Sequence, residues 1–256
     1  GRLLLLVLCA GLLLQLFFVA RIAIMVWVGP ESTTYQRSEA WQLTHSADGL
    51  RWRQQWVDYQ NISGNLTRAV IASEDAGFMD HHGVQWDAIQ KAYQRNIKAE
   101  ARAEQAEKAG NSGKPAKVYG GSTITQQLAK NLLLSGERNM LRKGQELVLA
   151  QLLELMLDKQ RILEIYLNNV EWGMGIFGAE AAAQHYFRKS AAQLSASEAA
   201  RLAAMLPAPK RFEKMPQSRY LAVRTRTITR YIPMFSPPWG ALPGRPRREA
   251  ALARRP

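Results

Sequence analysis

Residues 120–134 read GGSTITQQLAKNLLL, and this stretch decides much of the fold. Thr123 followed three residues later by Gln126 is a capping box, in which side chains satisfy the first backbone N–H groups of a helix. Apolar residues then recur at helical spacing to about Leu134. The pattern predicts a helix whose N-terminus carries hydroxyl and amide groups, which suit phosphate oxygens. The alternative is an ordinary, well-capped helix with no ligand.

Helical patterns extend outward from this stretch in both directions and predict a mainly α-helical protein. Strand-like alternation is scarce, and the chain contains no internal repeat. The expected helices cover residues 66–74, 87–97, 139–157, 159–167, 179–187, 195–205 and 217–231. Residues 99–117 are charged and then contain Gly, Ser and Pro, which predicts a solvated extension followed by a flexible loop. Residues 236–256, with SPPWG and GRPRR, predict an irregular basic tail.

The composition limits the function classes. The 256 residues include 47% hydrophobic residues, enough for a buried core, and a single cysteine, Cys9, which excludes an internal disulfide and a Cys-rich zinc site. The net charge of +13 is uneven, because residues 207–256 hold 12 basic and only 2 acidic residues. A uniformly basic nucleic-acid-binding domain is therefore not indicated. We expect the basic end to be attracted to anionic headgroups or wall polymers.

The N-terminal segment predicts a membrane anchor. Residues 3–20 read LLLLVLCAGLLLQLFFVA, and the apolar run resumes after Arg21. About 20 apolar residues span a bilayer as a helix, so we expect a signal-anchor helix over 1–28 and a juxtamembrane connection over 29–55. A cleaved signal peptide is the rival, but its apolar run is normally shorter and ends in a small-residue cleavage site. With Arg2 on the short side, the positive-inside rule places the N-terminus in the cytoplasm.

Several well-known motifs are absent or out of context. Residues 173–178, GMGIFG, match GxGxxG but follow a predicted helix instead of a strand, which argues against a dinucleotide site. Gly120 and Gly121 lack the Gly-Lys of a P-loop, and adjacent His81 and His82 without HExxH do not indicate zinc. The chain has neither Ser-x-x-Lys nor Lys-Thr-Gly, so it lacks a penicillin-binding acyl-serine site.

Three polar clusters remain within apolar helical surroundings. Glu74 and Asp75 end an apolar helix, where burial raises the pKa of a carboxyl toward that of a general base or acid. The second cluster is the helix N-terminus at 120–131. The third lies near the start of one helix and includes Arg138, Arg142, Lys143 and Glu146. Each has a structural alternative, namely a helix-end cap, an ordinary N-terminus and a surface salt-bridge ladder. Together they combine cations and carboxylates with hydroxyl and amide donors.

Five segments, taken in order, resemble the signatures of the glycosyltransferase domain that polymerises peptidoglycan. AVIASEDAGFMDHHGVQWDAI at 69–89 resembles the first, E-D-x-x-F-x-x-H-x-G, and 120–134 is similar to the second. RKGQE at 142–146 resembles the third, R-K-x-x-E, and residues 159–173 and 175–190 resemble the fourth and fifth. The implied domain covers 56–235, and because residues 99–118 make this part longer than the family pattern, we expect an exposed insertion there. Lacking the acyl-serine motifs, the chain is similar to the monofunctional transglycosylases and not to the bifunctional penicillin-binding proteins.

The resemblance implies a lysozyme-like helical domain with a small membrane-contacting lobe. It implies transfer of a lipid-linked glycan onto the 4-hydroxyl of lipid II, with inversion, a β-1,4 link and release of undecaprenyl diphosphate. By this resemblance Glu74 is the general base and Glu146 a second functional carboxylate. The implied diphosphate-binding residues are Lys130, Arg138, Arg142 and Lys143. The implied lining of the cleft is Asp75, Phe78, His81, Ser122, Thr123, Gln126 and Gln127.

The resemblance leaves room for a divalent cation, Mg²⁺ or Mn²⁺, with no residue assigned as its ligand, and implies no organic cofactor. The expected partners are lipid II, lipid-linked glycan, membrane lipids and other cell-wall synthesis proteins, but no nucleic acid. The expected location is the bacterial inner membrane, with one span and a periplasmic catalytic domain.

Two other function classes remain open at this point. A lysozyme-like hydrolase or lytic enzyme would also place a glutamate beside a helix. It would not need cations gathered against a diphosphate, namely Lys130, Arg138, Arg142 and Lys143. A non-catalytic, membrane-tethered binding protein would not need Glu74 and Glu146.

Overall fold

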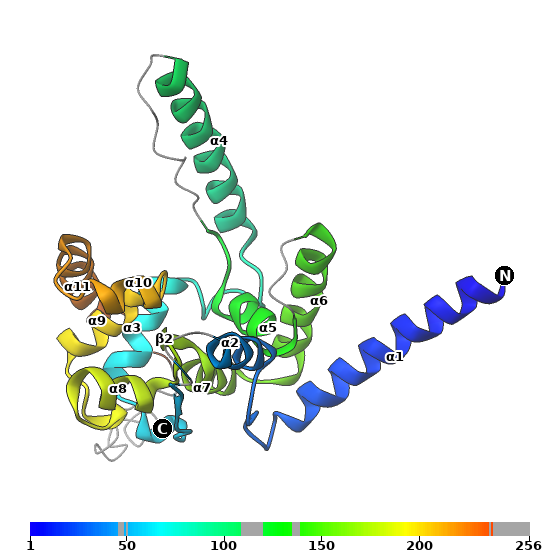
Figure 1. The fold of residues 1–256 in the computed structure, drawn as a ribbon, viewed down its shortest axis with the longest axis horizontal. Helices are drawn as coiled ribbons and strands as arrows, with labels where there is room; N and C mark the ends of the chain where they lie inside the picture. Colours follow the sequence, from blue (N-terminus) through cyan, green and yellow to red (C-terminus); the bar gives the residue numbers. More distant parts are fainter. Residues whose placement is uncertain (46–48, 50, 109–119, 135–138, 236, 238–256) are drawn as a thin grey trace, which may run out of the picture.

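The computed structural model describes residues 1–45, 49, 51–108, 120–134, 139–235 and 237. The described residues are mainly helical, which confirms the predicted fold class (Figure 1). The helices are α1 (Arg2–Ile24), α2 (Thr34–Thr44), α3 (Gly64–Glu74), α4 (Trp86–Lys108), α5 (Ile124–Leu133), α6 (Met140–Met156), α7 (Lys159–Asn169), α8 (Ala179–Phe187), α9 (Ala196–Met205), α10 (Pro209–Lys214) and α11 (Arg219–Tyr231). Three short 3-10 turns cover Tyr59–Asn61, Ala191–Gln193 and Ile232–Met234.

Local capping signals set several of these boundaries. Thr123 and Gln126 form the predicted capping box at the start of α5, and Ser195 and Glu198 form a second one at the start of α9. The Asn139 side chain accepts a hydrogen bond from the Arg142 backbone N–H at the start of α6. The predicted helices that begin at these caps are therefore confirmed.

The core of the domain forms where α9 packs against α3 and α11. The inward face of α9 carries Ala199, Ala200, Ala203 and Ala204, all fully buried, which lets neighbouring backbones approach closely. The largest buried side chains include Trp172 and Tyr166, each at most 1% exposed. Burying an aromatic or aliphatic side chain of this size contributes about 1.5–3 kcal/mol, so this core fixes the end of α3 in space.

A three-stranded sheet accompanies the helices. Its order is β1 (Arg53–Gln54), β3 (Ile176–Phe177), β2 (Glu171–Gly173), with β1 parallel and β2 antiparallel to β3. The GMGIFG segment forms the β2–β3 hairpin, and Gly175 has φ +68°. A Cβ at Gly175 would lie 1.8 Å from the Arg51 carbonyl oxygen, so strand packing requires this glycine. The turn therefore accounts for the motif without a dinucleotide.

The segment 29–55, expected as a connection, contains α2. Thr33 and Gln36 form a capping box at its start, and the Thr34 hydroxyl donates to the Leu132 carbonyl at 3.0 Å. These contacts attach α2 to α5. The sequence signal was weak because α2 is polar over most of its length.

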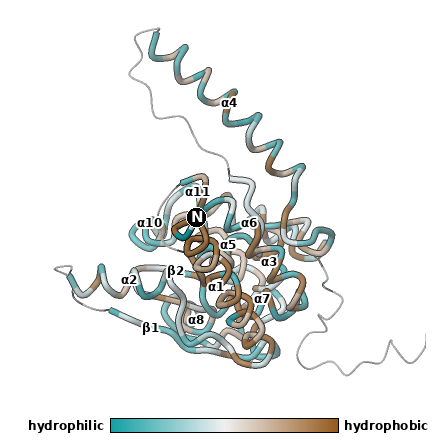
Figure 2. The backbone as a smooth tube through the Cα atoms, turned by 90° about the vertical axis from the view of Figure 1, so that its right-hand side faces the viewer, coloured by the Kyte–Doolittle hydropathy of each residue, from teal (hydrophilic) through white to brown (hydrophobic). Residues whose placement is uncertain are grey.

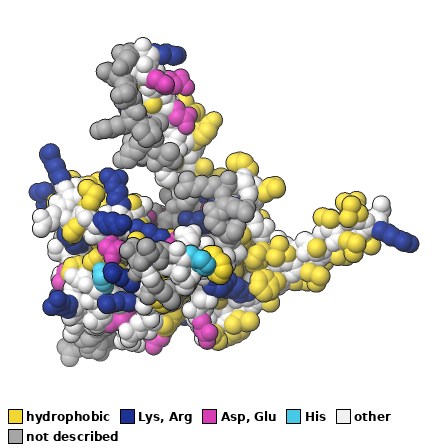
Figure 3. Space-filling model, viewed as in Figure 1, with side chains coloured by type: hydrophobic (Ala, Val, Ile, Leu, Met, Phe, Trp, Pro, Cys, Tyr) yellow, Lys and Arg dark blue, Asp and Glu magenta, His cyan; other side chains and the backbone are white. Residues whose placement is uncertain are grey.

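Helix α1 carries exposed apolar side chains along most of its length and extends away from the domain (Figures 1 and 3). By length and composition it is able to cross a membrane, and no other helix in the described part of the chain meets that test. Its most apolar window has a mean hydropathy of 2.8. Helix α1 packs against α6, where Gln15 and Gln145 exchange amide hydrogen bonds of 3.2 and 3.1 Å.

Helix α4 also extends away from the domain, and its outer half is hydrophilic (Figure 2). The expected insertion at 99–118 lies partly on this helix, because residues 99–108 form its last turns and most of them are exposed. Residues 109–118 lie outside the described part of the chain, as does the expected tail except for residue 237. Within the basic end, seven of the twelve cations lie on α10 and α11, namely Lys210, Arg211, Lys214, Arg219, Arg224, Arg226 and Arg230.

Candidate active site

Glu74 is the last residue of α3, where the packed core holds the helix end beside α5. Its two carboxylate oxygens accept hydrogen bonds from Ser73 Oγ and from Gln127 Nε2, each at 3.3 Å. Burial raises the pKa of Glu74 above the ordinary carboxyl value, and the bonds from Gln127 and Ser73 together with the Arg224 charge oppose that rise. Glu74 is therefore a carboxylate whose proton affinity suits a general base.

Asp75 has a different environment from Glu74, because it is buried and both of its carboxylate oxygens are hydrogen-bonded. His81 Nε2 lies 2.9 Å from each of its oxygens, and the Ile124 backbone N–H donates to it at 3.0 Å. His81 Nδ1 accepts from the Gly83 N–H at 3.1 Å, so the Nε2 proton is the one directed at Asp75. These bonds connect the end of α3 to the start of α5. Because Asp75 follows Glu74 directly, they also hold the Glu74 backbone in place.

Replacing Asp75 by alanine is expected to destabilise the protein by about 2–3 kcal/mol, because buried donors of His81 and Ile124 lose their acceptor. For a domain of this size the expected fall in Tm is roughly 4–12 °C. Thermal unfolding followed by circular dichroism measures it. Replacing the exposed Asp87 by alanine provides the control, and an equal Tm in the two variants would contradict the structural role of Asp75.

The two glutamines of the second cluster point to different sides of α5. Gln126 is fully buried, and its Oε1 accepts from the Thr123 N–H at 2.9 Å within the capping box. Gln127 faces Glu74, and its own Oε1 accepts from the Tyr166 hydroxyl at 3.0 Å. Thr123 is also turned inward, since its hydroxyl donates to the Gly83 carbonyl at 2.6 Å. Of these three residues, Gln127 alone contacts Glu74.

Phe78, which the resemblance placed in the cleft, is fully buried in the core. The Lys159 Nζ atom lies 4.5 Å from the centre of its ring and also ion-pairs with Glu154 at 2.8 Å. Phe78 therefore supports the loop that follows Glu74 through packing and a cation–π contact.

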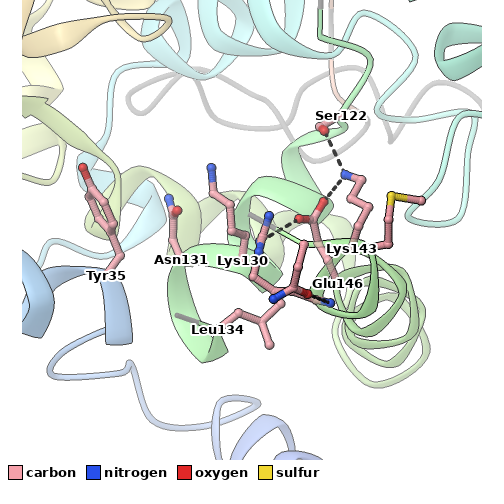
Figure 4. A pocket seen from close by; sticks show the side chains of 10 residues that line it. Tyr35, Ser122, Lys130, Asn131, Leu134, Lys143 and Glu146 are labelled. Atoms are coloured by element: carbon pink, nitrogen blue, oxygen red, sulfur yellow. Dashed lines mark hydrogen bonds and ion pairs between the residues drawn. The ribbon is translucent and has the colours of Figure 1, made fainter. Parts of the chain in front are cut away.

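The third cluster forms around Glu146 of α6, whose side chain is 4% exposed. Its two oxygens accept from two cations of the same helix, Lys143 Nζ at one oxygen and Arg142 Nη1 at the other, the latter at 3.4 Å (Figure 4). Lys143 Nζ also lies 3.3 Å from Ser122 Oγ, ahead of α5. Glu146 thus fixes both cations at the edge of one cavity, as the i,i+3 and i,i+4 spacings predicted.

The cavity has a volume of about 630 Å³, and residues of three helices line it. Lys130 and Asn131 come from α5, the Glu146 cluster comes from α6, and Tyr35 comes from α2 (Figure 4). Three cationic side chains, those of Lys130, Arg142 and Lys143, line it. Such a cavity can bind an anion with several oxygens. Arg138, predicted for the same role, lies outside the described residues.

The described residues do not fit a divalent-cation site. They contain no group of three or more His, Cys, Asp or Glu side chains that could hold a metal. Glu146, the carboxylate of the cavity, already contacts Lys143 with one oxygen and Arg142 with the other. A metal there would have to displace both cations, so we derive no chemical step through one.

The structure adds residues that the motifs did not indicate. Tyr35 lines the cavity and donates to Glu171 at 2.7 Å, and Tyr166 reaches Glu74 through Gln127. Arg224 of α11 donates from Nη2 to the Ser73 carbonyl at 3.2 Å, beside Glu74. Arg224 lay in a predicted helix, but its spacing carried no signal of a partner about 150 positions away.

Comparison with known proteins supplies independent information. A family model described as Transglycosylase matches residues 42–232. The chain is 52% identical over 219 residues to a biosynthetic peptidoglycan transglycosylase of Janthinobacterium sp. (strain Marseille), covering 86% of this chain and 88% of the relative. It is 49% identical over 232 residues to the protein of that description in Bordetella pertussis, covering 91% of each. A third relative with this description, from Paraburkholderia xenovorans, is 49% identical over 221 residues, covering 86% of each.

Proposed function

The chain belongs to the transglycosylase family, and from this premise we propose that Glu74 is the general base of the reaction and that the cavity around Glu146 binds the departing diphosphate. The protein is a peptidoglycan glycosyltransferase of cell-wall synthesis, and its substrate class is lipid II and the glycan built from it.

The bond-forming step needs a base. The 4-hydroxyl oxygen of the acceptor sugar attacks the anomeric carbon of the lipid-linked donor, and the bond from that carbon to the diphosphate breaks. The hydroxyl proton moves to the Glu74 carboxylate, and the diphosphate leaves with the bonding electron pair. One displacement inverts the anomeric centre and gives a β-1,4 link. Because burial raises the pKa of Glu74, its carboxylate binds this proton more strongly than an exposed carboxylate would.

The departing diphosphate needs positive charge. Lys130, Arg142 and Lys143 provide it within one cavity, with Glu146 holding two of them in position. Tyr35, Ser122 and Asn131 add polar groups to the same lining. Because the two Glu146 contacts fix the side chains beforehand, little reorganisation is needed when the charge develops.

The proposal rests on helix α5, which connects the proposed base, Glu74, with the cationic cavity. Gln127 contacts Glu74, and Lys130 lines the cationic cavity. Three residues apart, the two share a face of α5 and lie about 4.5 Å apart along its axis. A single substrate can therefore place its anomeric carbon near Glu74 and its diphosphate against Lys130. A hydrolase has no need of the cationic end of this arrangement.

We further propose the cellular arrangement. Helix α1 is consistent with a single-pass membrane anchor, and Arg2 at its N-terminal end favours a cytoplasmic N-terminus. The catalytic domain would then lie on the periplasmic side of the inner membrane, against the leaflet from which lipid-linked substrates are drawn. Membrane lipids and other cell-wall synthesis proteins are the proposed partners.

Labelled lipid II incubated with the purified full chain tests the activity class. The expected product is a glycan ladder that lengthens with time. A parallel sample receives preformed glycan without lipid II, and its length should stay constant. Shortening of the preformed glycan, with no polymer from lipid II, would assign the hydrolase function instead.

The pH dependence of kcat/KM tests the electrostatics of Glu74. The base is active when deprotonated, so activity falls as pH drops through its pKa, and this acidic limb should lie above the ordinary carboxyl value. Replacing Arg224 by Gln removes a charge that lowers the pKa of Glu74, so the limb should move to higher pH. Lysine at 224 should restore most of the original position. A limb that stays in place in Arg224→Gln would contradict this coupling.

A further inference from the structure

A second cavity lies beside the sheet and shares no lining residue with the cationic cavity around Glu146. We call it the strand-side cavity. It has a volume of about 720 Å³ and is bordered by the start of β1, the β2–β3 turn, α8 and α10. Its polar lining consists of Arg51, Arg53, His185, Glu213 and Lys214, and its aromatic wall is Trp52.

The polar lining has an excess of positive charge. Arg51, Arg53 and Lys214 have no ion pair or side-chain hydrogen bond with any residue that the structure describes. The one acid, Glu213, is already engaged, since it accepts from the Met174 N–H at 2.8 Å and lies 3.6 Å from His185 Nε2. Three uncompensated cations around one cavity attract an anion, and Arg in particular matches the geometry of a carboxylate.

The aromatic wall adds a flat surface to the charges. Trp52 is half-buried and packs on Phe177 with ring centroids 4.6 Å apart, which fixes the indole in place. It also borders a neighbouring cavity of about 490 Å³ that contains Gln54 and Trp56. Gln54, two residues after Trp52, lines that neighbouring cavity and not the strand-side cavity. The flat, half-buried indole suits the apolar face of a sugar ring.

We propose that the strand-side cavity binds the peptide-bearing glycan product, with a sugar ring against Trp52 and peptide carboxylates at Arg51, Arg53 and Lys214. The inference rests on the proposed function, because that reaction produces a polymer of N-acetylated sugars with acidic peptides. An anionic lipid headgroup is the rival occupant, because Gly29, Pro30 and Glu31, which follow the anchor α1, line the neighbouring cavity, although not this one. The strand-side cavity would hold the glycan strand after it leaves the cationic cavity.

Isothermal titration calorimetry of the full chain in detergent tests the site without turnover. The probe is a soluble GlcNAc–MurNAc-tetrapeptide, and the comparison probe is the same disaccharide without peptide. The peptide-bearing fragment should bind at least about tenfold more tightly. The double variant Arg53→Gln/Lys214→Gln should remove that difference, and added salt should weaken it. The double variant Arg102→Gln/Lys108→Gln, at two exposed positions of α4, is the matched charge control.

The outcomes separate this proposal from its rivals. Binding that is lost in Lys143→Ala but kept in Arg53→Gln/Lys214→Gln would place the fragment in the cationic cavity and overturn the proposal. Tighter binding of glycerol phosphate than of the peptide fragment, dependent on Arg53 and Lys214, would assign the site to a lipid headgroup. If the fragment binds but no polymer forms from lipid II, the proposed function is contradicted and the binding site is not. Trp52→Ala should also weaken binding, and the charge variant remains informative if Trp52→Ala fails to fold.

Discussion

Replacing Glu74 by Gln is expected to lower kcat for lipid II polymerisation by about a thousandfold, with KM changed by less than about threefold. Glutamine keeps the size of the side chain and a carbonyl oxygen for the Gln127 amide, whose contact with Glu74 is 3.3 Å. It cannot accept the proton of the acceptor hydroxyl. Because the substrate contacts remain, the loss should appear in turnover and not in binding. Initial rates over a range of lipid II concentrations separate the two constants.

The control is the same change at a carboxylate remote from the cavity. Glu198 caps α9 and ion-pairs with Lys189 at 2.8 Å, and the hydrogen bond from Lys189 is the main cause that lowers its pKa to about 2. Glu198→Gln therefore also removes a negative charge, yet kcat should stay within about twofold. Similar kcat values for Glu74→Gln and Glu198→Gln would contradict the assignment of Glu74.

Replacing Lys143 by Ala is expected to lower kcat/KM by about a hundredfold, the typical effect of removing one donor to a developing charge. Lys143 contacts Glu146 and Ser122 and lines the cationic cavity. Its loss leaves the diphosphate with fewer positive contacts in both the bound and the departing state. Glu146 keeps its contact with Arg142, so the helix should stay folded. Steady-state kinetics and Tm together report this variant.

Two further variants make that result specific. Lys143→Arg keeps the charge and should retain at least about a tenth of the kcat/KM. Lys108→Ala removes a lysine from the exposed end of α4 and should leave kcat/KM unchanged. If Lys143→Ala polymerises lipid II as efficiently as Lys108→Ala, the cationic cavity does not bind the diphosphate.

The helices and their caps could be predicted from the sequence because their signals are local. The Thr123 and Ser195 capping boxes lie within four residues of the backbone they satisfy, and both are present in the structure. The Arg142, Lys143 and Glu146 arrangement follows from helical spacing in the same way. The proposal that Glu74 is the base rests on the family signature, and the structure adds its buried environment.

Contacts between distant segments could not be predicted in this way. Tyr35 reaches the cationic cavity from α2, and Arg224 reaches the carbonyl of Ser73, although neither residue belongs to a recognised pattern. The sequence also did not separate the adjacent Gln126 and Gln127, or Glu74 and Asp75, by environment. Their different burial depends on which helix packs on each side, and that is set by the tertiary fold.

The most direct test of Glu74 as general base is the rate of lipid II polymerisation by wild type and Glu74→Gln over a series of pH values. The wild-type kcat/KM should fall on the acidic side, with a midpoint above the ordinary carboxyl pKa, because burial raises the pKa of Glu74. The residual rate of Glu74→Gln should show no such limb over the same range. An acidic limb that persists unchanged in Glu74→Gln would mean that another group removes the acceptor proton.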